Sequence, residues 1–294
     1  MNRQSIPYIL LQGLLFGTSV IASSFALGQF HPLTFLGLRL AMASLLFTAF
    51  YLWKGSGGRT IPKDRRLWFH ASVIGILGTA FPMWAFISSL QYLSSGVTSA
   101  LITIAPAFTL VLAHFLLPEE QMTRNKSLGV AFAFSGGLLI ALRGESGLAD
   151  GRQADSIGYI LVFMAIIIGG CRTIYAQRFM RTLDTFDVAS VRILTTTAVL
   201  LPISIWMVGI DLHTVDGWGY FALVYSTIAG TFLGIFGEFN LIKRFGATAA
   251  AMTAYVIPVV ASLGGVLLLG EQITSWIAVG MAFILLGITL TTSR

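Results

Sequence analysis

Long apolar runs, separated by short polar loops, make up most of the chain. The runs are close to the length of about 20 residues that a helix needs to cross a bilayer. They do not alternate between polar and apolar positions as barrel strands do, and backbone groups in lipid must be paired within the segment. The pattern therefore predicts an all-α integral membrane protein with ten transmembrane helices. The expected helices are Tyr8–Leu27, Leu33–Trp53, Leu67–Tyr92, Val97–Leu117, Ser127–Leu142, Ile157–Ala176, Val188–Val208, Trp218–Ile242, Ala247–Leu269 and Ser275–Thr291.

Composition agrees with this pattern and narrows the function classes. Of the 294 residues, 56% are hydrophobic and 10% are charged, and the mean hydropathy is +0.84. A soluble domain has about a quarter of its residues charged, so a soluble enzyme and a nucleic-acid binder are excluded. The single cysteine, Cys171, excludes an internal disulfide. No Cys/His spacing is typical of a metal site, and we expect neither metal nor cofactor.

The distribution of Lys and Arg predicts the orientation. With the amino terminus inside, the inner segments carry thirteen of the 18 basic residues and the outer loops carry only Arg143 and Arg152. Positive residues stay on the cytoplasmic side. Both termini are therefore expected in the cytoplasm.

The two halves of the sequence repeat each other. Residues 96–100 (GVTSA) recur as 246–250 (GATAA), and a proline and an E-Q-x-T sequence follow in each half. Gly129 and Gly136 likewise correspond to Gly280 and Gly287. We expect two five-helix domains, residues 1–150 and 151–294. Because five is odd, the second enters from the opposite side, which gives the inverted repeat of many secondary transporters. A duplicated scaffold without transport is the alternative.

Several short sequences resemble a known family. Phe16-Gly17-Thr18-Ser19, the PLTF sequence at 32–35 followed by Arg39, and Pro118-Glu119-Glu120 are similar to the drug/metabolite transporter superfamily, closest to its EamA-like exporters. Members often carry Trp where this chain has Phe16. The resemblance implies a carrier of the bacterial inner membrane that exports amino acids or related metabolites. It also implies a central cavity lined by spans one, three, four, six, eight and nine.

Ionisable residues inside spans are candidates for function, because burying charge in lipid is costly. Arg172 occupies the position that Ser19 occupies in the first half, and its guanidinium could grip a substrate carboxylate. Snorkelling to the inner surface is the alternative. Glu238 could pair with Arg172 or Arg192, or carry a coupled proton. Arg39 and Arg192 are repeat equivalents that the pattern favours as structural or interfacial.

The predicted cavity needs an apolar lining with a few polar groups. Prolines within spans kink helices and permit hinging. Gly13-x-x-x-Gly17 and Gly230-x-x-x-Gly234 are typical of close helix packing. The lining candidates are Gln12, Phe16, Ser19, Trp84, Thr103, Tyr175, Tyr225 and Tyr255, and the hinge candidates are Pro82, Pro106 and Pro258.

Secondary transport by alternating access is the function we expect, with a small molecule as substrate, the bilayer as surroundings, protons as a candidate coupling ion and no nucleic acid. The alternatives from the same superfamily are a lipid-linked-sugar flippase, a nucleotide-sugar carrier and efflux of drug-like compounds. A channel would need a continuous polar face, which the spans lack. A membrane enzyme would need a set such as His-Glu-x-x-His, which is absent.

Overall fold

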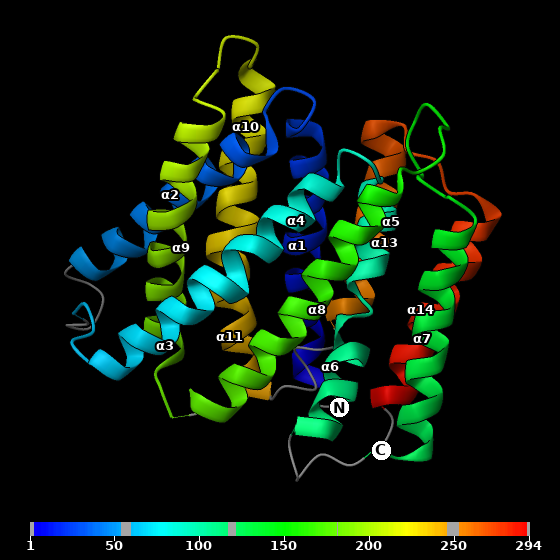
Figure 1. The fold of residues 1–294 in the computed structure, drawn as a ribbon, viewed down its shortest axis with the longest axis horizontal. Coiled ribbons are helices and arrows are strands. Elements are labelled where there is room, and N and C mark those ends of the chain that lie inside the picture. Colours follow the sequence, from blue (N-terminus) through cyan, green and yellow to red (C-terminus); the bar gives the residue numbers. More distant parts are fainter. Residues whose placement is uncertain (1–2, 54–59, 117–121, 181, 246–252, 293–294) are drawn as a thin grey trace.

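A computed structural model of the chain describes residues 3–53, 60–116, 122–180, 182–245 and 253–292, and this part is helical (Figure 1). Eight helical segments of 19 to 25 residues are long and apolar enough to cross a membrane, and two shorter apolar helices follow near the carboxyl end. The expected all-α architecture of ten spans is confirmed.

The elements follow one another as ten spans. In chain order they are η1 (Arg3–Ser5), α1 (Ile6–Ala26), α2 (Pro32–Leu52), α3 (Arg65–Gly75), η2 (Ile76–Ala80), α4 (Phe81–Ser89), α5 (Ser95–Ile102), α6 (Ala105–Leu116), α7 (Arg124–Leu142), α8 (Ser156–Phe179), α9 (Thr185–Met207), α10 (Gly217–Tyr225), η3 (Ser226–Leu233), α11 (Gly234–Phe245), α13 (Thr253–Leu269) and α14 (Ser275–Thr292). Span three is α3–η2–α4, span four is α5 with α6, and span eight is α10–η3–α11. These three runs were expected as continuous helices, and the structure interrupts each of them.

Polar side chains fix where the helices begin. The carboxylates of Asp64, Asp155, Asp184 and Asp216 accept backbone N–H bonds at the first turns of α3, α8, α9 and α10. Such caps satisfy donors that the helix itself leaves unpaired. The caps therefore fix the residues at which these four helices begin.

Glycines that correspond in the two sequence halves meet between α7 and α14. A methyl group at Gly129 would lie 2.5 Å from the carbonyl oxygen of Gly287. A methyl group at Gly280 would lie 2.9 Å from the carbonyl oxygen of Gly136. Gly129 corresponds to Gly280 in the repeat, and Gly136 corresponds to Gly287. Exchanging the two halves therefore turns the Gly129–Gly287 contact into the Gly280–Gly136 contact. Such reciprocity is the signature of a two-fold relation.

A second reciprocal contact joins α2 and α9. Ser44 Oγ and Thr197 Oγ1, which correspond in the repeat, lie 2.7 Å apart in a hydrogen bond. The pseudo-two-fold axis therefore passes near this pair. The two halves pack as an inverted repeat, as the sequence predicted.

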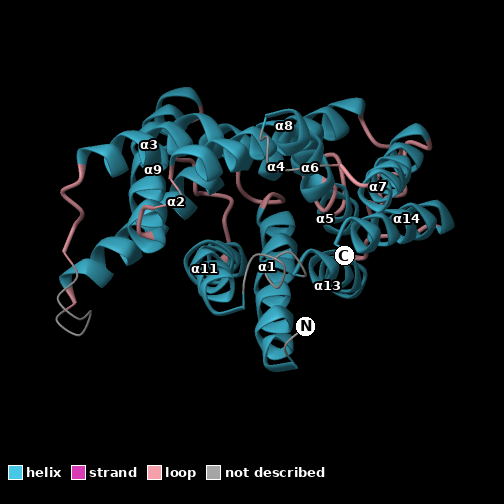
Figure 2. Cartoon of the chain, turned by 90° about the horizontal axis from the view of Figure 1, so that it is seen from below, coloured by secondary structure: helices cyan, strands magenta, loops and turns pink. Residues whose placement is uncertain are grey.

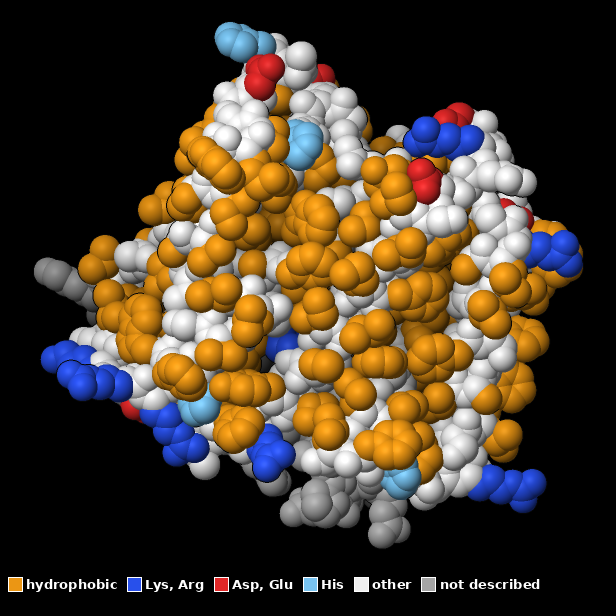
Figure 3. Space-filling view, in the orientation of Figure 1, with side chains coloured by type: hydrophobic (Ala, Val, Ile, Leu, Met, Phe, Trp, Pro, Cys, Tyr) orange, Lys and Arg blue, Asp and Glu red, His pale blue; other side chains and the backbone are white. Residues whose placement is uncertain are grey.

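The chain ends lie at the same end of the bundle (Figure 1). Figure 2, seen from that end, shows α1 between α11 and α13, and α1 packs against both. Basic side chains gather at this end in the space-filling view (Figure 3), and we call it the basic end. The opposite end, here the acidic end, carries Glu145, Asp150, Asp155, Asp211, Asp216 and Glu271 on its loops.

Candidate functional site

Two matched interruptions of helix geometry lie in spans three and eight. Residues 76–80 and 226–233 adopt π-helical turns, η2 and η3. Each contains a Gly-Thr pair, Gly78-Thr79 and Gly230-Thr231, at corresponding places in the repeat. π-Helical turns are rare and occur frequently at functional sites, and paired interruptions in the two halves indicate the binding region of a transporter.

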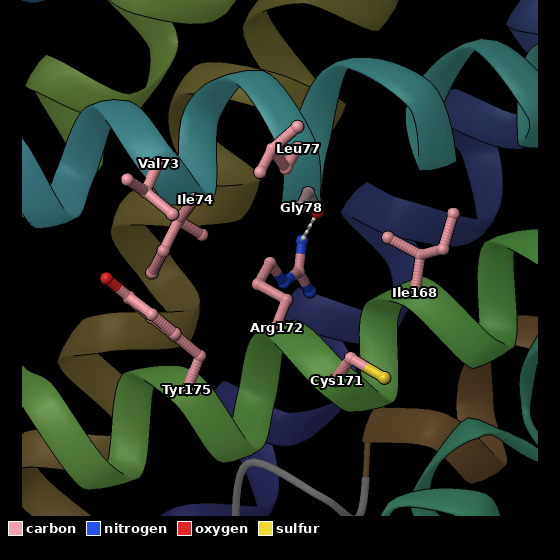
Figure 4. Close-up of a pocket in the computed structure, with 8 residues that line it drawn as sticks. All are labelled: Val73, Ile74, Leu77, Gly78, Ile168, Cys171, Arg172 and Tyr175. Carbon is pink, nitrogen blue, oxygen red and sulfur yellow. Dashed lines mark hydrogen bonds between the residues drawn. The ribbon is translucent and has the colours of Figure 1, made fainter.

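The first interruption faces Arg172 of α8. Arg172 Nη1 donates to the carbonyl oxygen of Gly78 at 3.4 Å. A methyl group at Gly78 would lie 2.8 Å from Arg172 Cγ, so only glycine lets the arginine stem pass. Both residues line a cavity of about 170 Å³ between span three and α8 (Figure 4). Tyr175 lines the same cavity, and its hydroxyl lies 2.8 Å from Nδ1 of His70.

The second interruption faces α1 at the pseudo-symmetric place. Gly230 packs so closely on Ser19 that a methyl group there would overlap Ser19 Oγ and lie 2.6 Å from Nη2 of Arg39. Arg39, from α2, donates to Thr231 Oγ1 at 2.8 Å, Ser23 Oγ at 3.0 Å and Ser19 Oγ at 3.2 Å. Arg39 is only 6% exposed. The residue that sequence favoured as structural is thus a buried cation among hydroxyl groups.

Two further predicted residues on α1 also contact span eight. Gln12 is buried, and its Nε2 donates to the carbonyl oxygen of Gly234 at 2.6 Å. A methyl group at Gly234 would lie 2.6 Å from Phe16 Cε1. At the other side of η3, the Tyr225 hydroxyl donates to Thr18 Oγ1 at 2.8 Å. Gln12, Phe16, Ser19 and Tyr225 therefore lie along one interface.

Other predicted residues lie elsewhere. Trp84 of α4 packs beside Leu161 and Ala165 of α8. Thr103 is buried and donates to Ser99 O of its own helix at 2.7 Å. Tyr255 packs against the apolar cluster of spans four, five, six and ten.

The predicted hinge prolines have different surroundings. Pro82 lies in the first turn of α4, directly after η2. Pro106 lies in the first turn of α6, after the break in span four. Pro258 lies inside α13, which continues past it. Their role as hinges stays a prediction.

The structure describes only part of the predicted coupling pair, Glu238 and Arg192. The backbone of Glu238 belongs to α11, but its side chain lies outside the described part of the structure. Arg192 lies in α9, where its carbonyl oxygen accepts from Thr196 Oγ1 at 2.7 Å. Whether these two side chains pair stays a prediction.

Glu271 joins the two halves at the acidic end, in the loop between α13 and α14. Its carboxylate accepts from Ser95 N at 2.7 Å, Ser95 Oγ at 2.8 Å and Gly96 N at 3.3 Å, all at the start of α5. Burial raises the pKa of Glu271, while the hydrogen bonds from Ser95 and Gly96 oppose that rise. Glu271 also lines a cavity of about 340 Å³ with Gln91 and Ser24.

Arg39 was expected to be structural or interfacial, and no role was expected for Glu271 or Thr231. One signal was present: Gly78-Thr79 and Gly230-Thr231 repeat at the spacing of the matched prolines. The π-helical turns themselves have no recognisable sequence signature within an apolar run. The contacts of Arg39 depend on how α1, α2 and η3 cross, which no local pattern encodes.

Comparison with known proteins shows which protein family the chain belongs to. The profile of the EamA-like transporter family matches residues 3–142 and again residues 156–293. The chain belongs to the EamA-like transporter family. It is therefore a multi-pass membrane transporter of the drug/metabolite transporter superfamily and not an enzyme.

Similar proteins agree with this membership. A transporter of Archaeoglobus fulgidus is 26% identical over 281 residues, which cover 95% of this chain and 95% of the relative. The inner membrane transporter YedA of Escherichia coli is 26% identical over 289 residues, covering 95% of this chain and 89% of YedA. A crystal structure with 19% identity matches the fold with a TM-score of 0.68, covering 99% of this chain and 96% of that chain.

Proposed function

We propose that this EamA-like transporter exports small organic solutes that carry a carboxylate, amino acids and related metabolites among them, by alternating access. The observation that carries the proposal is the pair of matched π-helical turns, each of which has an arginine side chain against it. Interrupted helices at corresponding places in inverted repeats form midplane binding sites. The reciprocal packing of the halves supports a rocking motion about their shared axis.

Arg172 is the residue we propose for the carboxylate. Arg172 is one of the residues that line the cavity between span three and α8, and its Nη1 lies 3.4 Å from Gly78 O beside it. A guanidinium matches the two oxygens of a carboxylate with paired hydrogen bonds. The apolar side chains of Ile74, Leu77 and Ile168 complete the lining. A cationic group within an apolar lining fits a small solute with one acidic end.

The test is a ligand screen on the purified protein. Ligands that bind the native state raise the unfolding midpoint. We expect carboxylated amino acids or metabolites to raise it, and Arg172→Gln to weaken the best hit by roughly ten- to a hundredfold. Arg178→Gln is the matched control, because Arg178 lies in the same helix but is exposed at the basic end. If decarboxylated analogues raise the unfolding midpoint as much as the carboxylated ligands, the carboxylate role is refuted. If no ligand of the screen raises the midpoint, a lipid-linked or drug-like substrate is favoured.

We further propose the bacterial inner membrane as the location, with both termini in the cytoplasm. The support is the gathering of Lys and Arg at the end that holds both chain ends. The name of the relative YedA places that protein in the inner membrane. We expect fluorescence from a fluorescent protein that folds only in the cytoplasm when it is fused to either terminus. A fusion that is inserted in the membrane but does not fluoresce would show the opposite orientation.

A further inference from the structure

A histidine and a tyrosine share a hydrogen bond beside the cavity that Arg172 lines. The Tyr175 hydroxyl lies 2.8 Å from Nδ1 of His70, and Tyr175 is one of the cavity-lining residues. Tyr175 follows Arg172 by three residues, which places both on one face of α8. Figure 4 shows the Tyr175 ring reaching from α8 toward Ile74 of α3. His70 precedes Ile74 by four residues on the same face of α3, so the hydrogen bond joins the two helices that enclose the cavity.

Charged side chains on the elements around His70 are mostly cationic. His70 is half-buried, and its ring stacks on that of Phe179 with centroids 5.6 Å apart. α3 packs against α8, α9 and η2. Besides His70, the charged residues of these four elements are Arg65, Arg66, Arg172, Arg178, Asp187 and Arg192. Asp187 accepts from the Tyr51 hydroxyl at 2.9 Å, and Asp64 accepts from a backbone N–H at the start of α3. Because like charges repel, an anion in the cavity would favour a positive charge on His70.

The direction of the hydrogen bond depends on whether His70 is protonated. A neutral imidazole can accept a hydrogen bond, whereas an imidazolium carries a proton on both nitrogens and can only donate. Protonation at Nδ1 therefore makes the Tyr175 hydroxyl the acceptor, and the hydroxyl keeps its own proton for another partner. Carboxylate oxygens only accept hydrogen bonds. A carboxylated solute in the cavity is thus better matched when His70 is protonated.

We propose that His70 is a proton-binding site linked to the cavity: as an anionic solute enters, His70 takes up one proton from water, and the Tyr175 hydroxyl turns its own proton toward the solute. This linkage rests on the proposed function, because it needs a carboxylate beside Arg172. His70 does not touch the solute; it positions the hydroxyl and adds a compensating charge.

The linkage works in both directions. A proton that strengthens solute binding is itself bound more strongly when the solute is present. Histidine changes its charge between about pH 5 and 8. The cavity should therefore bind an anionic solute more tightly at the acidic end of this range and less tightly at the basic end.

The test is isothermal titration calorimetry on the full-length protein in detergent, with 4-methylpentanoate as the probe. Its branched apolar chain suits the lining by Ile74, Leu77 and Ile168, and its carboxylate stays ionised above about pH 6. We expect an affinity about tenfold higher at about pH 6 than at about pH 8.5, because a nearby opposite charge shifts a protonation equilibrium by roughly one unit or more. Titrations in two buffers of different ionisation enthalpy should show uptake of roughly half a proton or more near neutral pH.

Two variants test the pair, and a third is the matched control. His70→Gln keeps a hydrogen-bonding side chain that does not titrate, so it should take up no proton and bind equally at both pH values. Tyr175→Phe keeps the ring beside Phe179 but loses the hydroxyl, and the pH effect on affinity should fall below about threefold. His114→Gln makes the same substitution in the last turn of α6, outside the cavity lining, and should behave as wild type.

The outcomes separate this linkage from the proposed function. Proton uptake in wild type and His114→Gln that is lost in His70→Gln supports the linkage. If 4-methylpentanoate binds wild type at neither pH, both the carboxylate role of Arg172 and the linkage are overturned. If the probe binds without proton uptake, or if His70→Gln takes up as many protons as His114→Gln, the linkage alone is overturned. If His70→Gln does not fold, an equal pH effect in wild type and Tyr175→Phe overturns the linkage.

Discussion

Replacing Glu271 should loosen the join between the two halves at the acidic end. Its carboxylate comes from the loop after α13 and receives the first backbone N–H groups of α5, together with the Ser95 hydroxyl. Glu271 is 7% exposed, and Ser95 and Gly96 are buried. Glu271→Ala therefore leaves donors of Ser95 and Gly96 buried without an acceptor.

The cost follows from the number of stranded groups. A buried donor left unsatisfied costs about 1–3 kcal/mol, so the two backbone donors predict a loss of roughly 2–6 kcal/mol in the free energy of unfolding. Glu271→Gln keeps one acceptor oxygen and should lose only about 1–2 kcal/mol. Gln272→Ala, in the same loop, removes an exposed bond to Ala149 O and should change stability by less than about 0.5 kcal/mol.

Reversible unfolding in mixed detergent micelles measures these differences. The expected order of stability is wild type, then Glu271→Gln, then Glu271→Ala, with Gln272→Ala close to wild type. A loss below about 1 kcal/mol for Glu271→Ala would refute the reasoning, since it would mean that the α5 donors find another acceptor at no cost.

The raised pKa of Glu271 also gives a pH dependence. Burial favours the protonated side chain in the folded protein. Protonation therefore adds stability that is fully present below the ordinary pKa of 4.5 and is lost as the pH rises through the raised value. The stability of wild type relative to Glu271→Gln should fall as the pH rises across this window. A difference that is independent of pH would contradict the burial argument.

Three shorter predictions test other parts of the account. Gly136→Ala should lose about 1–3 kcal/mol by overpacking against Gly280, whereas Gly169→Ala, with open space around it, should not destabilise the protein; thermal unfolding compares them. Hydrogen bonds from the α10 backbone and Gln29 lower the pKa of Asp216, so the advantage of wild type over Asp216→Asn should shrink as the pH falls through that lowered value. Glu238→Gln should abolish transport driven by a pH gradient but spare solute exchange, as measured in proteoliposomes; loss of both with folded protein would refute a proton role.

The sequence predicts the architecture well because the architecture depends on local, repeated patterns. The length of each apolar run predicts a span, and the matched glycines predict the repeat, whereas the packing of α7 on α14 is shown by the structure. Gly129, Gly136, Gly280 and Gly287 carry this information because close backbone contact tolerates no side chain. Their pairing in the fold follows the repeat register read from the sequence.

The site is less predictable because it depends on how helices cross. Arg172 was predicted as a candidate from its position in the repeat, and the structure places it beside a cavity; its role in binding stays a prediction. Arg39 was given a structural role, because nothing in span two shows that it reaches Ser19 and Thr231. Thr103 was expected in the cavity, but its hydroxyl bonds to its own helix.

The central claim is that the protein carries carboxylated solutes between its two halves. Counterflow into proteoliposomes tests it most directly, with labelled amino acids and their decarboxylated amines as paired solutes. The account predicts uptake of the carboxylated solute above that of empty liposomes, a loss of this uptake in Arg172→Gln, and normal uptake in Arg178→Gln. Uptake no greater than in empty liposomes, or equal loss of both solutes in Arg172→Gln, would contradict it.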